Sequence, residues 1–133
     1  MMPGSGKVLI VEDEFLVALQ LEDILCDGGH AVLGTVLDME SCIMLEEGPD
    51  VALVDLNLRD GLTGPEIARQ LALRFGARVI YVTANPGQID VPAPTAIGFV
   101  QKPFTRGSIL AAVEYALAGC PAARRPAELE PLH

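Results

Sequence analysis

The sequence predicts an α/β fold: a doubly wound, three-layer domain with helices on both faces of a parallel, five-stranded sheet. Short apolar runs alternate with helical patterns along the chain, as they do in βαβ units. Most positions in these runs are apolar, which is typical of strands buried on both faces. The 133 residues, half of them hydrophobic and a fifth charged, suit one globular domain and are too few for two.

The first half of the chain is expected to supply strands at residues 7–11, 31–36 and 50–54. A helix follows the first strand, because apolar residues recur at helical spacing until Gly28 and Gly29 end the segment. The residues that set this spacing are Phe15, Leu16, Leu19, Ile24 and Leu25. Asp38 is a suitable N-cap for a second helix, which includes Glu46 and stops at Gly48.

The second half is expected to supply a helix at 65–75, strands at 78–82 and 97–100, and a final helix at 105–118. Pro65 suits a first helical turn, and Gly76 ends that helix. The stretch from Asn85 to Thr95 contains three prolines, at positions 86, 92 and 94. Internal prolines break helices, so we expect a short or absent helix with a mobile backbone there.

The folded domain is expected to span residues 7–118. Residues 1–6 lack an apolar pattern and are predicted to form a disordered N-terminus. Residues 119–133 contain three prolines and two adjacent arginines, and are predicted to form a flexible C-terminal tail.

The composition excludes several classes of function. A net charge of −9, with nine basic and eighteen acidic residues, argues against a nucleic-acid surface. Cys26, Cys42 and Cys120 match neither a zinc site nor a paired motif, and are expected to be buried or half-buried free thiols in a reducing cytosol. No apolar run approaches the length of a bilayer span. We therefore expect a cytoplasmic protein without membrane contact.

Polar residues follow four of the five predicted strands. The first strand is followed by Glu12 and Asp13, the third by Asp55, the fourth by Thr83 and the fifth by Lys102. In an open parallel sheet the carboxyl ends of the strands form the active edge, so these side chains should meet there. Clustered carboxylates repel one another unless a cation lies between them, and oxygen ligands with room for water suit Mg²⁺.

This set of groups fits phosphoryl transfer to a carboxylate. With Mg²⁺ bound, Asp55 could attack a phosphoryl group as a nucleophile. The ammonium of Lys102 would help to neutralise the phosphoryl oxygens, and the hydroxyl of Thr83 could donate a hydrogen bond to one of them.

The chain resembles the receiver domains of bacterial two-component response regulators. The resemblance covers residues 7 to about 118 and rests on four motifs in order, each at a strand end. These are Leu9-Ile10-Val11-Glu12-Asp13-Glu14, Val54-Asp55-Leu56-Asn57, Val82-Thr83-Ala84 and Phe99-Val100-Gln101-Lys102-Pro103-Phe104. It implies a flavodoxin-like (βα)5 fold with strand order 2-1-3-4-5. The Asn85–Thr95 stretch is similar to that of a subgroup with a degenerate fourth helix, which is paired with atypical histidine kinases.

The resemblance also implies a role for each matched residue. Asp55 would be the phosphoacceptor, Asp13 a direct Mg²⁺ ligand and Glu12 mainly a ligand through water, with the backbone carbonyl of Asn57 as a further ligand. Thr83 and Lys102 would hold the acyl phosphate, and Pro103 would fix the following turn through a cis peptide bond. Phe99 would be the switch aromatic that follows Thr83.

The same resemblance implies a switch and its partners. The protein would assist its own phosphorylation and dephosphorylation rather than act as an enzyme on other substrates. The donor would be a histidine kinase or a histidine phosphotransfer protein, and output would pass to an unidentified protein, from a monomer or a phosphorylation-dependent dimer. Arg59 lies near Asp55 in sequence and is hypothesised to modulate phosphate loss.

Other interpretations remain open at this stage. Taken one at a time, each residue has a purely structural explanation. Glu12 and Asp13 would be acids at a helix N-terminus, and Asp55 a turn residue. Thr83 would be a strand-end hydroxyl, Lys102 a surface lysine and Phe99 a core aromatic. A pseudo-receiver would bind partners without phosphorylation. A phosphatase of the haloacid dehalogenase type also uses an aspartate nucleophile and Mg²⁺, but it needs a second aspartate where this chain has Asn57.

Overall fold

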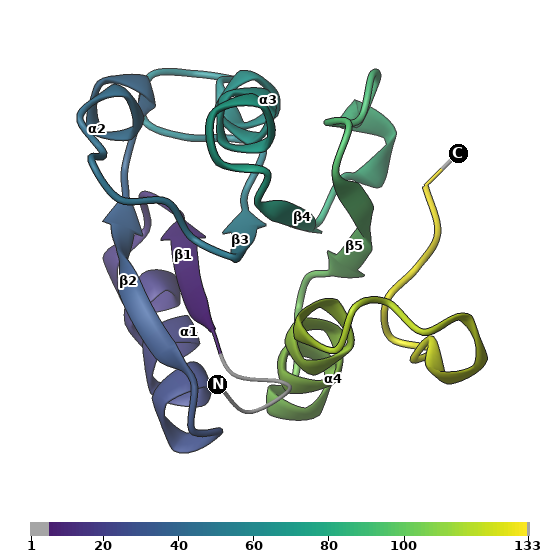
Figure 1. Ribbon diagram of the computed structural model, residues 1–133. Helices are drawn as coiled ribbons and strands as arrows, with labels where there is room; N and C mark the ends of the chain where they lie inside the picture. Colours follow the sequence, from purple (N-terminus) through teal and green to yellow (C-terminus); the bar gives the residue numbers. More distant parts are fainter. Residues whose placement is uncertain (1–5, 133) are drawn as a thin grey trace.

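The fold is a five-stranded parallel sheet with the strand order β2-β1-β3-β4-β5, as predicted (Figure 1). The structure is a computed structural model that describes residues 6–132, so the disorder expected for residues 1–5 lies outside the described part. The strands are β1 (Lys7–Val11), β2 (Ala31–Val36), β3 (Val51–Val54), β4 (Arg78–Thr83) and β5 (Ala96–Gln101). All four strand pairs are parallel.

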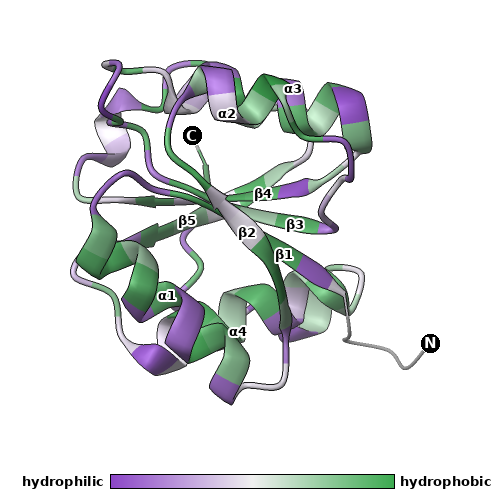
Figure 2. Cartoon of the chain, turned by 90° about the vertical axis from the view of Figure 1, so that its left-hand side faces the viewer, coloured by the Kyte–Doolittle hydropathy of each residue, from purple (hydrophilic) through white to green (hydrophobic). Residues whose placement is uncertain are grey.

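Two helices cover each face of the sheet, which gives three layers (Figure 2). The helices are α1 (Phe15–Asp27), α2 (Met39–Ile43), α3 (Gly64–Phe75) and α4 (Arg106–Leu117), with short 3-10 helices at η1 (Pro86–Gln88) and η2 (Ala122–Arg124). Helices α1 and α4 lie on one face, and α2 and α3 on the other. Each face has its own apolar cluster, so strands β1, β3 and β4 are buried on both sides.

Local sequence accounts for where the helices begin and end. The carboxylate of Asp38 accepts a hydrogen bond of 2.9 Å from the backbone N–H of Ser41 and so caps α2, as predicted. Thr105 and Ser108 form a reciprocal capping box at the start of α4. Gly76 ends α3 in the left-handed conformation, at φ 65°.

Several expectations from the sequence were wrong in detail. Helix α2 was expected to include Glu46 but ends at Ile43. The helix predicted from the spacing of Phe15 and Leu16 is confirmed as α1, in which both side chains are 75% exposed. Cys26 is exposed rather than half-buried, whereas Cys42 is buried and Cys120 half-buried.

The short or absent helix expected between β4 and β5 is confirmed, whereas the mobile backbone expected there stays a prediction. Between β4 and β5 only the three-residue helix η1 forms, and it begins at Pro86. The backbone N–H of Ala93 in this connection donates a hydrogen bond of 2.9 Å to the hydroxyl of Tyr81 on β4.

The C-terminal segment differs from the flexible tail that the sequence predicted. Leu129 is 1% exposed and belongs to the apolar cluster beneath α1 and α4. Glu130 pairs with Phe99 of β5 in an antiparallel bridge. Burial of one large apolar side chain and these backbone contacts hold residues that look like a linker by composition alone.

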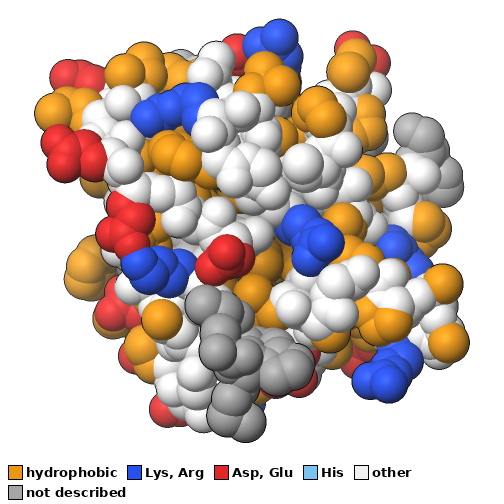
Figure 3. All heavy atoms as spheres, viewed as in Figure 1, with side chains coloured by type: hydrophobic (Ala, Val, Ile, Leu, Met, Phe, Trp, Pro, Cys, Tyr) orange, Lys and Arg blue, Asp and Glu red, His pale blue; other side chains and the backbone are white. Residues whose placement is uncertain are grey.

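On the face drawn in Figure 3, basic side chains lie scattered among acidic and apolar ones. Across residues 6–132, no helix is long and apolar enough to cross a membrane.

Candidate functional site

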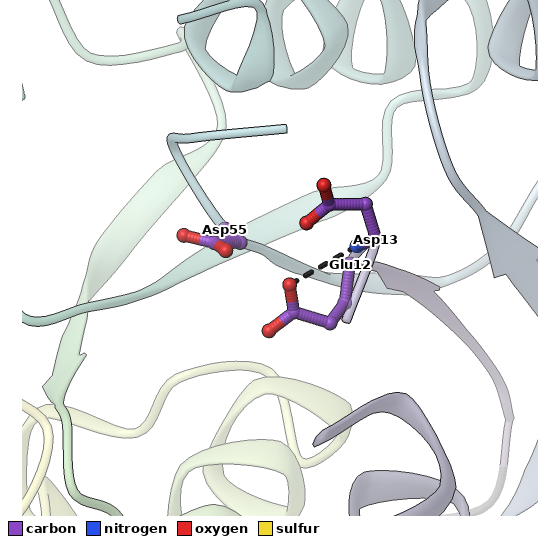
Figure 4. Close-up of side chains that lie close together, drawn as sticks. All are labelled: Glu12, Asp13 and Asp55. Atoms are coloured by element: carbon purple, nitrogen blue, oxygen red, sulfur yellow. Dashed lines mark hydrogen bonds between the residues drawn. The ribbon is translucent and has the colours of Figure 1, made fainter. Parts of the chain in front are cut away.

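Three carboxylates converge at the carboxyl edge of the sheet. Glu12 and Asp13 follow β1 and Asp55 follows β3; each offers an oxygen atom, and these atoms all lie within 4.8 Å of one another. Their side chains face a common space, as Figure 4 shows. Glu12 is 1% exposed, and Asp55 is 8% exposed. The predicted grouping of these three residues is therefore confirmed.

The backbone fixes the positions of these acids. The N–H of Asp55 donates to the carbonyl of Val11 at 2.9 Å, and the N–H of Glu12 donates to the carbonyl of Val36 at 3.0 Å. These bonds continue the parallel ladder one residue beyond the strands. The Glu12 carboxylate in turn accepts a hydrogen bond of 3.0 Å from the N–H of Asp13, drawn as the dashed line in Figure 4.

Gly64 is a positioning residue that the sequence analysis missed. Its N–H donates to the carbonyl of Leu56 at 3.1 Å, so the start of α3 lies directly against the loop after β3. A Cβ atom on residue 64 would lie 2.1 Å from the carbonyl oxygen of Asp55. Any side chain would therefore displace the backbone that carries Asp55. The sequence shows two glycines in the loop 61–64, but only the structure reveals that Gly64 is the one that lies against the backbone of Asp55.

Lys102 bridges two of the acids. Its Nζ lies 3.0 Å from Oε1 of Glu12 and 3.4 Å from Oδ2 of Asp55. Burial lowers the pKa of Lys102, but the contacts with Glu12 and Asp55 outweigh it and raise the pKa above its ordinary value. The lysine therefore carries its charge at neutral pH. The Lys102–Pro103 peptide bond is cis, as the resemblance implied.

Burial makes Glu12 a weak acid. Removal from water, together with the adjacent Asp55, raises the pKa of Glu12 from 4.5 to about 7, although Lys102 acts in the opposite direction. The two negative charges are only partly balanced by one ammonium. Such a site favours either a bound proton or an additional cation.

The donor set fits Mg²⁺. The three side chains provide only carboxylate oxygens, which are the ligands of hard cations. Asp13 is half-buried, which leaves room for water ligands. Burial and the nearby Asp55 raise the pKa of Glu12, and a divalent cation would offset both effects by stabilising the charged carboxylate.

Thr83 and Phe99 lie beyond the acid cluster, toward β5. Thr83 is 1% exposed, and its backbone carbonyl accepts a hydrogen bond of 2.9 Å from the N–H of Lys102. Its hydroxyl accepts a hydrogen bond of 2.9 Å from the N–H of Asn85 and still has a proton to donate. Phe99 is 6% exposed and packs in the apolar cluster beneath α2 and α3.

Three hydrogen bonds in the loop after β3 were not anticipated. The side-chain amide of Asn57 donates a hydrogen bond of 2.9 Å to the side-chain oxygen of Gln88, which ties the loop after β3 to η1. Asp60 accepts hydrogen bonds from Thr63 and from the N–H of Met39. The bond from Met39 to Asp60 spans 21 residues and that from Asn57 to Gln88 spans 31, so local patterns could not reveal these two.

Arg59 points to a partner other than Asp55. Its Nη2 lies 2.6 Å from Oδ2 of Asp38, and its Nε lies 2.9 Å from the same oxygen. Hydrogen bonds from Ser41, together with Arg59, lower the pKa of Asp38 to about 2. Arg59 therefore links the loop after Asp55 to the N-terminus of α2.

Comparisons with known proteins agree with this geometry. The sequence profile of the response regulator receiver domain matches residues 8–114. The phyllosphere-induced regulator PhyR of Methylorubrum extorquens is 30% identical over 127 residues, which cover 91% of this chain and 47% of that protein. This chain therefore spans about half the length of that curated relative.

Solved structures give the same picture. The PhyR receiver domain of Erythrobacter litoralis has a TM-score of 0.74 at 34% identity, and the match covers 86% of this chain and 91% of that one. The response regulator PhyR of Brucella abortus has a TM-score of 0.77 at 29% identity, over 90% of this chain and 50% of that one. The similarity thus extends over nearly all of an isolated receiver domain and half of a longer regulator.

Proposed function

Because the chain belongs to the response regulator receiver domain family, a family of signalling switches, we propose that Asp55 accepts a phosphoryl group in a Mg²⁺-dependent reaction. The observation that carries the proposal is the position of Lys102 Nζ, which contacts both Glu12 and Asp55 at the edge of the acid cluster. A charged ammonium and a carboxylate nucleophile are then side by side where a phosphoryl group would arrive.

The reaction transfers one phosphoryl group. A carboxylate oxygen of Asp55 attacks phosphorus, an O–P bond forms, and the P–N bond to the histidine of the donor breaks. Water later attacks phosphorus and releases inorganic phosphate, which restores the carboxylate. Glu12, Asp13 and Asp55, with the backbone carbonyl of Asn57, would hold Mg²⁺, whose charge offsets that of the phosphoryl oxygens. The ammonium of Lys102, which contacts Glu12 and Asp55, would help to neutralise the same oxygens.

Thr83 and Phe99 would report the phosphorylated state. The Thr83 hydroxyl has a free proton that can be donated to a phosphoryl oxygen, at the expense of its present contact with Asn85. Phe99 would follow, because it lies on β5 beside the strand that carries Thr83. The acyl phosphate would thus bias a two-state equilibrium.

The exposed start of α1 supports docking of the phosphodonor there. Phe15 and Leu16 are 75% exposed and Leu19 is 43% exposed, next to Asp13 in the chain. A phosphohistidine must approach Asp55 from solvent at this edge, so the donor surface would cover these side chains. The donor would be a histidine kinase or a histidine phosphotransfer protein, and the output partner would be a protein.

One experiment separates this function from its alternatives. The full chain is incubated with acetyl phosphate and Mg²⁺, and the intact mass is measured. We expect a labile adduct of one phosphoryl group in the wild-type chain and none in Asp55→Asn. No adduct at any Mg²⁺ concentration would instead favour a pseudo-receiver, and repeated turnover of small phosphate esters would favour a phosphatase.

A further inference from the structure

The C-terminal segment adds itself to the exposed edge of the sheet. After α4 the chain passes through η2 and runs along β5, which is the last strand of the sheet (Figure 1). The N–H of Phe99 donates to the carbonyl of Glu130 at 3.0 Å, and the N–H of Glu130 donates to the carbonyl of Phe99 at 2.8 Å. This pair is antiparallel on an otherwise parallel sheet. An edge strand with free N–H and C=O groups is a template for strand addition, and here the chain's own segment occupies it.

Side chains anchor the segment on both faces of the sheet. Leu129 is 1% exposed and fills the apolar cluster beneath α1 and α4. Leu132 packs against the cluster on the opposite face, where it lines a hollow of about 220 Å³ with Phe99 and residues of η1. The segment therefore shares a hollow with the side chain of Phe99 and bonds to its backbone.

Strand β5 is shaped to admit the segment. Gly98 has φ +154°, and a Cβ atom there would lie 2.6 Å from the carbonyl oxygen of Glu130 and 2.9 Å from Cδ1 of Leu129. Only glycine allows this approach. One residue earlier, the carbonyl of Ile97 accepts a hydrogen bond of 2.9 Å from Nη2 of Arg125, and the same guanidinium lies 5.9 Å from the ring centre of Tyr115.

The contact point is next to the switch residues. Phe99 pairs with Tyr81 of β4, and two residues later Gln101 pairs with Thr83. The N–H and carbonyl of Phe99 that would face solvent are both used by Glu130. A displacement of Thr83 and Phe99 would thus act directly on the only backbone pairing between the segment and β5 among residues 6–132.

We propose that residues 125–132 form a displaceable strap, which covers the β5 edge while Asp55 is unphosphorylated and is released when Asp55 is phosphorylated. The release rests on the proposed function, since it needs the acyl phosphate to draw Thr83 and then Phe99 away from Glu130. Two backbone hydrogen bonds, one arginine–carbonyl bond and one buried leucine hold the strap. Release uncovers the β5 edge, the Leu129 site and the hollow beside Phe99 as one surface.

The strap is tested by hydrogen exchange at the amide of Glu130 in the full chain, with and without acetyl phosphate and Mg²⁺. We expect at least tenfold faster exchange in the phosphorylated chain, with the amides of β1 unchanged. An adduct at Asp55 with unchanged protection at Glu130 would overturn the strap and leave the proposed function intact. Absence of an adduct would defeat both, so the intact mass distinguishes the two failures.

Two matched pairs of variants make the test independent of one substitution. Glu130→Pro removes the N–H that bonds to Phe99, while Glu130→Ala keeps it. Arg125→Ala removes the bond to Ile97, while Arg124→Ala makes the same change of charge on an exposed neighbour. Because coupling is reciprocal, Glu130→Pro and Arg125→Ala should each raise the phosphorylated fraction at limiting acetyl phosphate severalfold, and their partners should not. Equal fractions within both pairs would overturn the coupling.

Discussion

The carboxyl edge of the sheet and the side edge at β5 are built in different ways. At the carboxyl edge, Glu12, Asp13, Asp55 and Lys102 come from the ends of three strands and have few chemical substitutes. At the β5 edge, a proline-rich connection forms only the short helix η1, and a returning C-terminal segment covers the strand. Chemistry constrains the first edge residue by residue, whereas shape and backbone pairing constrain the second. The two edges therefore place different demands on the sequence: the carboxyl edge needs particular side chains, whereas the β5 edge needs a shape and a set of backbone groups.

The largest expected effect is on the rate of adduct formation when Lys102 is replaced, and Lys7, the other lysine of the chain, provides the control. Lys102→Met should slow adduct formation with acetyl phosphate on the order of 100-fold, because it removes a preorganised positive charge from the phosphoryl oxygens. Lys7→Met, which changes only an ion pair with Glu47, should leave the rate within about twofold. The rates are measured by intact mass against time. Equal rates in the two variants would remove Lys102 from the reaction.

A stability measurement tests whether the β5 edge depends on the strap. Leu129→Ala should lower the free energy of unfolding by about 2–5 kcal/mol, because it leaves a cavity where a fully buried leucine packs. Leu73→Ala, at a side chain that is 59% exposed, should cost less than about 0.5 kcal/mol. Urea denaturation measures both values. Similar small losses in both variants would mean that the segment is flexible, as its composition first indicated.

The pH dependence of Mg²⁺ binding tests the carboxyl edge alone. The pKa of Glu12 is raised from 4.5 to about 7, so the metal-free folded state takes up a proton in this window. Protonated Glu12 therefore stabilises the fold below about pH 4.5, and this contribution is lost as the pH rises through about 7. Mg²⁺ must displace that proton, so its affinity should rise by up to about tenfold per pH unit toward pH 7 and level off above.

Calorimetric titration from pH 5.5 to 8 measures this dependence, and two neighbouring variants provide the comparison. Glu12→Gln should flatten the profile, because no carboxyl remains at that position to titrate. Glu14→Gln, at an exposed residue two positions away, should keep it. A profile that persists in Glu12→Gln would assign the dependence to another group.

A smaller effect is expected where the donor docks. Phe15→Ala should slow phosphotransfer from a histidine phosphodonor roughly fivefold, or about 1 kcal/mol, because it removes an exposed apolar contact beside the acids. The rate with acetyl phosphate should not change, since that donor is too small to cover α1. Val91→Ala, at an equally exposed side chain in the β4–β5 connection, is the control. An equal loss with both donors would mean that the substitution disturbs the site itself.

The smallest expected effect concerns Arg59. Because Asp38 holds its guanidinium in an ion pair at the surface, Arg59→Ala should change the rate of phosphate loss measurably, but by less than about fivefold. Arg69→Ala, which breaks an exposed ion pair on α3, is the matched control. A rate identical to that of the wild type would remove Arg59 from the dephosphorylation step.

The two edges also differ in how much of each could be predicted from the sequence, because the first depends on local patterns and the second on long-range contacts. Glu12, Asp55 and Lys102 follow apolar strands, and parallel topology brings strand ends together, so their convergence could be inferred from local patterns. The strap could not be inferred, because Leu129 and Glu130 meet β5 about 30 residues away and their composition resembles that of a linker. Gly64 and Gln88 were missed for a similar reason: their roles depend on one close approach and one long-range hydrogen bond.

The most direct test of the link between the two edges is a titration of the isotope-labelled full chain with beryllofluoride and Mg²⁺, followed by amide NMR. We predict that the amides of Asp55 and Thr83 and those of Phe99 and Glu130 shift along the same titration curve, and that none shifts in Asp55→Asn. Shifts at Asp55 and Thr83 with unchanged signals at Phe99 and Glu130 would contradict the coupling. Unchanged signals at Asp55 itself would contradict phosphoryl acceptance.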